Sequence, residues 1–357
     1  MYLLRLLVLG ALLLSLFGCS ESGGSESAAP TPPGTVVLRG AGATFPSPLY
    51  KKWFESYHAT HPGVAVEYDA VGSGEGIRRF MGRNVTEAER LDFGASDAAM
   101  TDQEIADTPN GVVMVPITAG SVVIAYNLPE ASGHLRLSRG ALAGIFLGDI
   151  RTWNDPRIAK TNPGLKLPKL TIAPVVRQDA SGTNFAFTKH LDAINEKWRS
   201  LYGAATLVNW PGNAMRAKGN EGVAARIQQS LGSIGYVGFE FARKLSLNMA
   251  AIENREGRFV EPTEMSGTAA FLNTEMPANL RVFLADPSGP DAYPIVTFSW
   301  ILLYKNYSQP AKPEAIKDLF RWALTDGQKY ASELGYISLP AAITNRALAA
   351  LNAAPAS

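Results

Sequence analysis

Residues 36–53 read VVLRGAGATFPSPLYKKW, and this stretch decides the fold class of the chain. It opens with a short β-rich run over 36–39, passes through a glycine-rich turn and continues into a helical pattern over 48–58, in which Leu49 and Trp53 share one side. A strand that turns through glycines into a helix is typical of α/β proteins. We therefore predict α/β architecture.

The same alternation continues along the chain. A β-rich run over 64–68 precedes a helical pattern over 75–82. Two longer apolar runs, 112–126 and 293–304, are rich in β-branched and aromatic residues, which indicates long buried strands. Residues 265–280 contain Asn, Thr, Pro and Gly with weak periodicity, so we expect an irregular surface region there.

Composition limits the classes of protein to consider. The 357 residues are 46% hydrophobic and 18% charged, which predicts a folded chain of about two domains and excludes a largely disordered or polytopic membrane protein. Thirty-three basic and 32 acidic side chains leave a formal charge of +1, so we expect no nucleic-acid partner. The single cysteine excludes an internal disulfide, a cysteine zinc cluster and an iron–sulfur site.

Cys19 ends a leader in which Arg5 is followed by an apolar run over 6–14. This run is shorter than the roughly 20 residues of a spanning helix, so we expect a signal peptide over 1–18. The tetrapeptide LFGC resembles the bacterial lipobox, which implies lipidation of Cys19; an ordinary signal peptide with an incidental thiol is the alternative. The next residues carry no large apolar side chain, so the lipidated cysteine and a flexible tether should occupy 19–35. We expect an exported protein, periplasmic or at the cell surface, held at a membrane by its lipid.

Three turns between a predicted strand and a predicted helix can offer hydrogen-bond donors to one ligand. They are GAGATFP with Thr44, GSGEG with Ser73, and RQDASGT, in which Arg177 adds a cation. Each turn alone is explained by capping, because Ser, Thr and Gly are common at helix N-caps and tight turns. Together they suit an oxyanion, since helix N-termini carry unpaired N–H groups and a partial positive charge.

The first turn also imitates the dinucleotide-binding fingerprint. Phe45, however, stands where the third glycine belongs, and Glu67 and Asp69 lie beyond the usual distance of the ribose-binding acid. Many hydroxyl and amide donors with one arginine suit a buried tetrahedral anion better.

Asp97, in the motif DFGASDA, is a candidate selectivity residue. From the residues alone it is better explained as a turn or N-cap aspartate. Beside an anion, an ionised carboxylate only accepts hydrogen bonds, so it tolerates a ligand that carries a proton and repels one that does not. Phosphate keeps a proton at neutral pH and sulfate keeps none.

The chain from about Val36 to Ala349 resembles the PstS family, the phosphate-binding proteins of bacterial ABC phosphate importers. The motifs that carry the resemblance are GAGATFPSPLYKKW (40–53), DFGASDA (92–98), NPGLKLP (162–168), VVRQDASGTNF (175–185) and IGYVGFEFA (234–242). For the phosphate site the resemblance implies these roles: Thr44 donates through its hydroxyl and amide, Phe45 through its amide and Ser73 from the second turn; Asp97 accepts the phosphate proton; Arg177 pairs with the anion; and Ser181, Gly182 and Thr183 donate at the third helix start. Glu75 adds a carboxylate near this site, and we expect it to point to solvent.

The resemblance also implies a two-lobed periplasmic-binding-protein fold of type II-like class. Each lobe would be a mixed sheet flanked by helices, and two crossover strands would join the lobes. Lobe I would combine 36–118 with 293–357, lobe II would span 124–286, and the hinges would lie near 119–123 and 287–292. Closure about the hinges would bury phosphate away from water.

The implied function is a monomeric phosphate receptor that delivers to the membrane subunits and ATPase of an ABC permease. We expect no cofactor, no metal and no catalysis. Two alternatives stay open: a binding protein for another oxyanion, against which Asp97 argues, and a lipid-anchored phosphatase. The four histidines occur in no HExxH motif, and the chain has no GxSxG motif. His58 and His61 are better explained as a solvated helix end than as a metal pair.

Overall fold

The computed structural model describes residues 34–131, 135–272 and 274–353. The predicted signal peptide, Cys19 and most of the predicted tether lie outside the described residues. Within the described ranges, no helix combines the length and the apolar character needed to cross a membrane.

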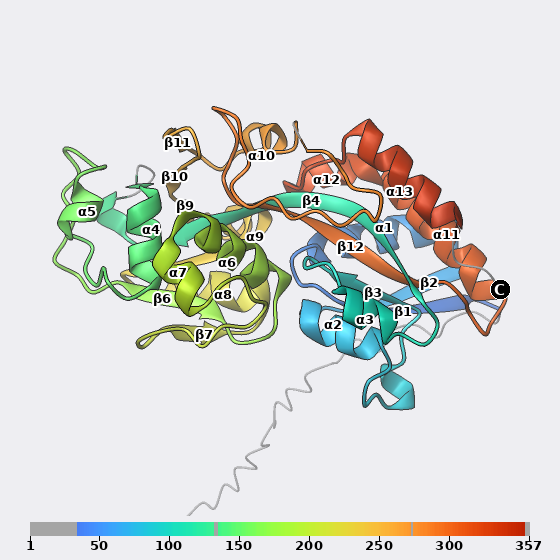
Figure 1. Ribbon diagram of the computed structural model, residues 1–357. Helices are drawn as coiled ribbons and strands as arrows, with labels where there is room; N and C mark the ends of the chain where they lie inside the picture. The colour runs from blue at the N-terminus through green and yellow to red at the C-terminus, as the bar shows by residue number, and fades with distance from the viewer. Residues whose placement is uncertain (1–33, 132–134, 273, 354–357) are drawn as a thin grey trace, which may run out of the picture. The chain divides into compact units, whose positions relative to one another are not determined.

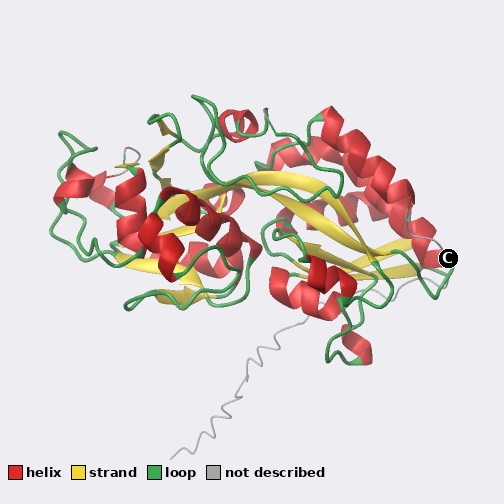
Figure 2. Cartoon of the chain, viewed as in Figure 1, coloured by secondary structure: helices red, strands yellow, loops and turns green. Residues whose placement is uncertain are grey.

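Twelve strands form two sheets in the part that the structure describes (Figures 1 and 2). The strands are β1 (Val36–Gly42), β2 (Val64–Asp69), β3 (Phe93–Ser96), β4 (Val112–Tyr126), β5 (Arg136–Leu137), β6 (Ala173–Arg177), β7 (Met215–Ala217), β8 (Ser233–Gly238), β9 (Asn248–Met249), β10 (Ala251–Glu253), β11 (Phe259–Val260) and β12 (Val296–Tyr304). Nine of them follow the order β2-β1-β3-β12-β4-β8-β6-β7, with β9 also paired to β4, and the small second sheet has the order β11-β10-β5.

Strand β4 joins two halves of the large sheet (Figure 1). The first half contains β2, β1, β3 and β12, and the second half contains β8, β6 and β7. Up to Ser121, β4 pairs antiparallel with β12, and from Val122 it pairs antiparallel with β8. In the first half β1 is parallel to β2 and β3, and in the second half β6 is parallel to β7 and β8. Both halves are therefore mixed, and the predicted α/β architecture is confirmed.

Helices connect and cover the strands in both halves (Figure 2). The α-helices are α1 (Ser47–Thr60), α2 (Ser73–Phe80), α3 (Asp102–Ala106), α4 (Arg139–Phe146), α5 (Pro156–Ala159), α6 (Gly182–Ile194), α7 (Glu196–Leu201), α8 (Gly219–Gln229), α9 (Phe239–Lys244), α10 (Glu264–Ala269), α11 (Ala311–Leu324), α12 (Lys329–Leu334) and α13 (Ala341–Ala353). In the first half, α1, α2 and α11 pack against strands, whereas α6 and α8 do so in the second half.

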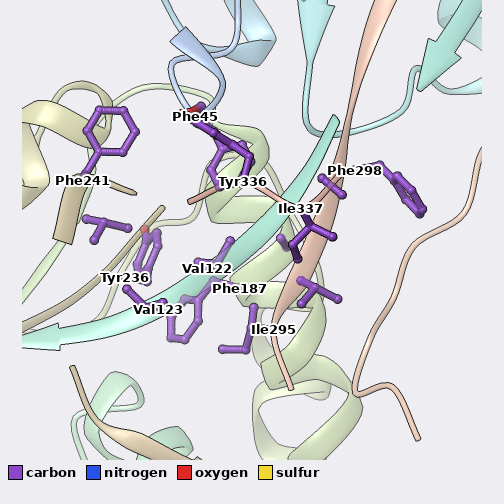
Figure 3. Packing of buried hydrophobic residues seen from close by; sticks show 14 of the residues in the cluster. Phe45, Val122, Val123, Phe187, Tyr236, Phe241, Ile295, Phe298, Tyr336 and Ile337 are labelled. Carbon is purple, nitrogen blue, oxygen red and sulfur yellow. The ribbon is translucent and has the colours of Figure 1, made fainter. Parts of the chain in front are cut away.

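Buried side chains from many elements meet around β4 (Figure 3). Val122 is fully buried, and Phe187 of α6 stacks on Tyr236 of β8 with ring centroids 4.4 Å apart. Phe45 meets Tyr336 edge-on at 5.7 Å. The long apolar run over 112–126 is therefore apolar on both faces because β4 is buried on both faces.

The prediction of an irregular surface region over 265–280 is wrong in part. Helix α10 begins this stretch, and Phe271, Met276 and Leu280 after it are buried. Phe271 packs edge-on against Phe298 of β12, with centroids 4.9 Å apart. The sequence signal is weak because α10 has only six residues and the apolar side chains after it follow no regular period.

We expect Gly76→Ala to destabilise the protein. A Cβ atom on Gly76 of α2 would lie 2.4 Å from the Cα of Gly42 and 3.0 Å from the carbonyl oxygen of Ala41. Both are backbone atoms of β1, which cannot move aside easily. The free energy of unfolding should therefore fall by about 1–3 kcal/mol. Urea denaturation measures this loss.

Gly140→Ala in α4 is the matched control. A Cβ atom there meets nothing within 4 Å, and alanine favours the helix by roughly 1 kcal/mol over glycine. Its stability should be unchanged or higher. An equal loss of stability in both variants would contradict the close approach of α2 to β1.

Candidate anion-binding site

The predicted site residues lie where strands end and helices begin. In chain order, they are Thr44 and Phe45 between β1 and α1, Ser73 at the start of α2, Asp97 directly after β3, Arg177 at the end of β6, and Ser181, Gly182 and Thr183 at the start of α6. All of them are buried. Polar side chains this deeply buried need partners, so their hydrogen bonds define what the site can hold.

Ser73 connects three of the predicted residues. Its Oγ accepts the backbone N–H of Asp97 at 3.2 Å and the backbone N–H of Gly182 at 3.1 Å. Gly182 comes so close to Asp97 that an added Cβ atom would lie 2.5 Å from the Cβ atom of Asp97. Glycine is required for this approach, and it brings the end of β3 and the starts of α2 and α6 to one place.

Asn220, at the start of α8, connects the first turn to the third and was not predicted. Its Nδ2 donates to Thr44 Oγ1 at 3.0 Å and to Thr183 Oγ1 at 3.1 Å. The signal that could have found it is a fourth strand-to-helix turn, between β7 and α8, in which Gly219 has a positive φ of 68°. The two threonines are thus held together by an amide between them.

Phe45 and Ser181 share no hydrogen bond with the other predicted residues in the part of the chain that the structure describes. The carbonyl oxygen of Phe45 accepts from Tyr336 Oη at 2.8 Å. Ser181 caps α6, because its Oγ accepts the N–H of Asn184 at 3.1 Å. In a cap of this kind the serine hydroxyl keeps its own proton available for a ligand.

Arg177 supplies the buried cation. Its Nε donates to Asp179 Oδ1 at 2.9 Å, and its Nη2 also pairs with this carboxylate. Burial alone would raise the pKa of Asp179, but the hydrogen bond and charge of Arg177 outweigh burial and lower it. Within the described residues Nη1 of Arg177 has no hydrogen-bond partner, so one charged donor remains available.

Asp97 has a pKa near neutral pH. Its side chain is buried, and burial raises its pKa to about 7, against the opposing effects of a hydrogen bond from Ser299 and the charge of Arg177. The bond from Ser299 Oγ to Asp97 Oδ1 measures 2.8 Å. Near neutral pH this carboxyl can therefore either accept a proton from a ligand or keep one.

Glu240, a second buried carboxyl, was also not predicted. It lies in α9 with its Oε1 so near the backbone of Gly238 that a Cβ atom there would be 2.3 Å away. Burial raises the pKa of Glu240 well above its usual range, and among the described residues neither of its carboxyl oxygens has a hydrogen-bond partner. Burial thus favours the neutral, protonated form of Glu240.

Glu75 is held by two arginines on α2. Its carboxylate lies 2.7 Å from Arg78 Nε and 2.8 Å from Arg79 Nε, and its side chain is one-third exposed. These hydrogen bonds, that from Arg78 first, lower the pKa of Glu75 to about 2. Its negative charge is compensated at the surface of α2, so it does not stand unpaired beside the site.

Comparison with known proteins places the chain among binding proteins. The family model described as a PBP superfamily domain matches residues 28–326. The phosphate-binding protein PstS of Methanocaldococcus jannaschii is 36% identical over 370 residues, which cover 97% of this chain and 94% of that one. PstS of Pasteurella multocida is 39% identical over 307 residues, covering 85% of this chain and 86% of the relative.

Solved structures share the fold. The phosphate-binding protein from Stenotrophomonas maltophilia superposes with a TM-score of 0.73 at 20% identity and covers 88% of this chain and 94% of that one. A high-affinity periplasmic phosphate-binding protein bound with phosphate gives a TM-score of 0.73 at 21% identity, with coverage of 88% and 93%. By sequence and by fold, the chain belongs to the PstS family of phosphate-binding proteins.

Proposed function

We propose that this protein binds inorganic phosphate at the helix starts around Arg177 and delivers it to an ABC phosphate import permease. The observation that carries the proposal is the buried guanidinium of Arg177 with an available Nη1. Its partner Asp179 accepts the backbone N–H of Gly219 at the start of α8, and the charge of Arg177 acts on Asp97. Relatives named as phosphate-binding proteins, and a neighbour solved with phosphate, support this choice of anion. The site acts as a receptor and carries out no reaction on its ligand.

The hydrogen-bond capacity of the site fits phosphate. The hydroxyls of Thr44, Ser73 and Thr183 each have a proton to donate, and the start of α6 favours negative charge. Arg177 contributes one full positive charge, and Asp97 accepts from a protonated oxygen. A ligand with three acceptor oxygens and one donor hydroxyl satisfies every one of these groups.

Phosphate capture would proceed by closure of two lobes. We assign 36–118 together with 293–357 to one lobe and 124–286 to the other. The change of partner in β4, from β12 to β8 between Ser121 and Val122, supports a hinge at that point. Closure would exclude water and so strengthen each hydrogen bond to the anion.

The protein is further proposed to work as an exported monomer anchored to a membrane by lipid on Cys19. The leader and lipobox-like tetrapeptide support this anchor. The polar residues of the tether would let the folded part reach the permease from its anchor.

Replacing Cys19 tests the anchor. The parent, expressed with its leader in a bacterial host, should partition into the detergent phase of Triton X-114, because acyl chains favour that phase. Cys19→Ser should move to the aqueous phase or remain an unprocessed precursor. Ser20→Ala is the control and should behave as the parent does. A parent found wholly in the aqueous phase would argue for an ordinary signal peptide.

Removing the arginine tests the function itself. Equilibrium dialysis of the leaderless protein with labelled phosphate should show binding that falls by roughly 10- to 100-fold in Arg177→Met, as expected for loss of a charge-assisted hydrogen bond. Arg157→Met is the control, because Arg157 lies in a half-exposed pair with Asp155. The control should bind as tightly as the parent.

Two results would oppose this function. Equal phosphate binding by the parent and Arg177→Met would remove the cation from the site. Release of p-nitrophenol from p-nitrophenyl phosphate by the parent, and not by Arg177→Met, would support the phosphatase alternative instead.

Asp97 makes selectivity depend on pH. Because its pKa is about 7 in the ligand-free protein, Asp97 is mostly ionised at pH 8 and mostly protonated at pH 6. The ionised carboxylate repels sulfate, whereas the protonated one can donate to it. The preference for phosphate over sulfate, measured by competition dialysis, should therefore be larger at pH 8 than at pH 6.

Asp97→Asn provides the control for the ionisation of phosphate itself. An amide donates at both pH values, so the preference should be weaker at pH 8 than in the parent and should change less with pH. The same change with pH in both proteins would show that Asp97 does not discriminate between the anions.

A further inference from the structure

Asn220 holds the two threonine hydroxyls of the site in one orientation. It is fully buried, and its backbone N–H donates to Thr44 Oγ1 at 3.2 Å, in addition to the bonds from its Nδ2 to both threonines. Its Oδ1 accepts the backbone N–H of Gly238 at 3.0 Å. All polar atoms of this amide are therefore used within the protein.

The contact with Gly238 determines which way the amide points. A backbone N–H only donates, so the side-chain atom that faces it must be the oxygen. The nitrogen then faces Thr44 and Thr183, and because an amide nitrogen only donates, both hydroxyl oxygens must accept from it. The backbone N–H of Gly238 thus determines which atom donates and which accepts in each hydrogen bond from Gly238 through Asn220 to the two threonines.

The consequence is largest at Thr44. A hydroxyl has two acceptor positions and one proton, and the N–H and Nδ2 of Asn220 fill both acceptor positions of Thr44. Among the described residues neither Thr44 nor Thr183 donates its proton to a protein acceptor. Ser73 has the same arrangement, since it accepts the N–H groups of Asp97 and Gly182.

We propose that Asn220 is a positioning residue that directs the hydroxyl protons of Thr44 and Thr183 toward the bound anion. The inference rests on the proposed function, because it names what orients donors in that same site. Asn220 and Thr44 belong to different proposed lobes, so their hydrogen bonds form as the lobes close. In the closed site these bonds fix the direction of the hydroxyls, and this orientation contributes to affinity without any contact between Asn220 and the ligand.

Two substitutions of Asn220 test this role by phosphate titration calorimetry. Asn220→Ala lets the hydroxyls turn freely and should weaken phosphate binding by about 10-fold, the scale of one net hydrogen bond to a charged group. Asn220→Asp keeps the size and can still accept from Gly238, but its second oxygen would take the threonine protons. It should weaken binding by at least about 100-fold, since two donors are lost and a like charge is added.

A double-mutant cycle separates orientation from a structural effect. In a Thr44→Val, Thr183→Val background there are no hydroxyl protons to direct, so Asn220→Ala should weaken binding by less than about twofold. Loss of affinity by the same factor in both backgrounds would overturn the proposal. If Asn220→Ala does not fold, Asn220→Asp is compared in the two backgrounds in the same way.

Asn162→Ala is the matched control. Asn162 is also a buried asparagine with bonds to backbone, accepting from Arg136 N–H at 2.8 Å and donating to the carbonyl oxygen of Ile158 at 2.8 Å. It should lower thermal stability and leave phosphate affinity unchanged. A parent that binds no phosphate would refute the proposed function, whereas a parent that binds and a cycle without coupling would refute only the role of Asn220.

Discussion

The candidate site depends on one serine hydroxyl. Ser73 Oγ accepts two backbone N–H groups, from Asp97 and from Gly182. Asp97 follows β3 in the first half of the large sheet, whereas Gly182 begins α6, which packs against β8 in the second half. The close approach of Gly182 to Asp97 leaves no room for a side chain at that glycine. The ends of β3 and β6 and the starts of α2 and α6 are positioned with respect to one another by this contact. Asn220 then joins Thr44 to Thr183, and Asp179 holds Arg177.

Each carboxyl group near the site is either paired with arginine or has its pKa raised by burial. Asp179 is paired with Arg177, and Glu75 is paired with two arginines of α2. Burial raises the pKa of Glu240 well above its usual range and so favours its neutral form. Burial raises the pKa of Asp97 to about 7, so this carboxyl changes its charge near neutral pH. An anion in the site would therefore meet one carboxyl whose protonation it can share, which suits a ligand that itself carries a proton.

Local patterns predicted the parts of the structure that are determined locally. The glycine-rich turns, the run over 112–126 and the strand-to-helix alternation follow from backbone preferences and burial, and they indicated the fold. Asn220 and Glu240 were missed because their roles arise from residues far away in the chain: Thr44 lies 176 positions before Asn220. Helix α10 was missed because a six-residue helix carries little periodicity. Sequence reasoning thus found the groups that offer donors and missed the amide of Asn220, which orients two of them.

The small net charge of the chain is consistent with an anion site that selects its ligand through the direction of hydrogen bonds. A cluster of lysines would attract any anion and would hold sulfate as well as phosphate. Here one guanidinium provides charge, and the hydroxyls of Thr44 and Ser73, with both acceptor positions occupied, provide protons of fixed direction. Such hydroxyls cannot turn to accept a hydrogen bond from a ligand, whereas the carboxylate of Asp97 can accept the ligand proton. Selectivity would then come from the number and direction of donors and acceptors, which a neutral protein can provide as well as a basic one.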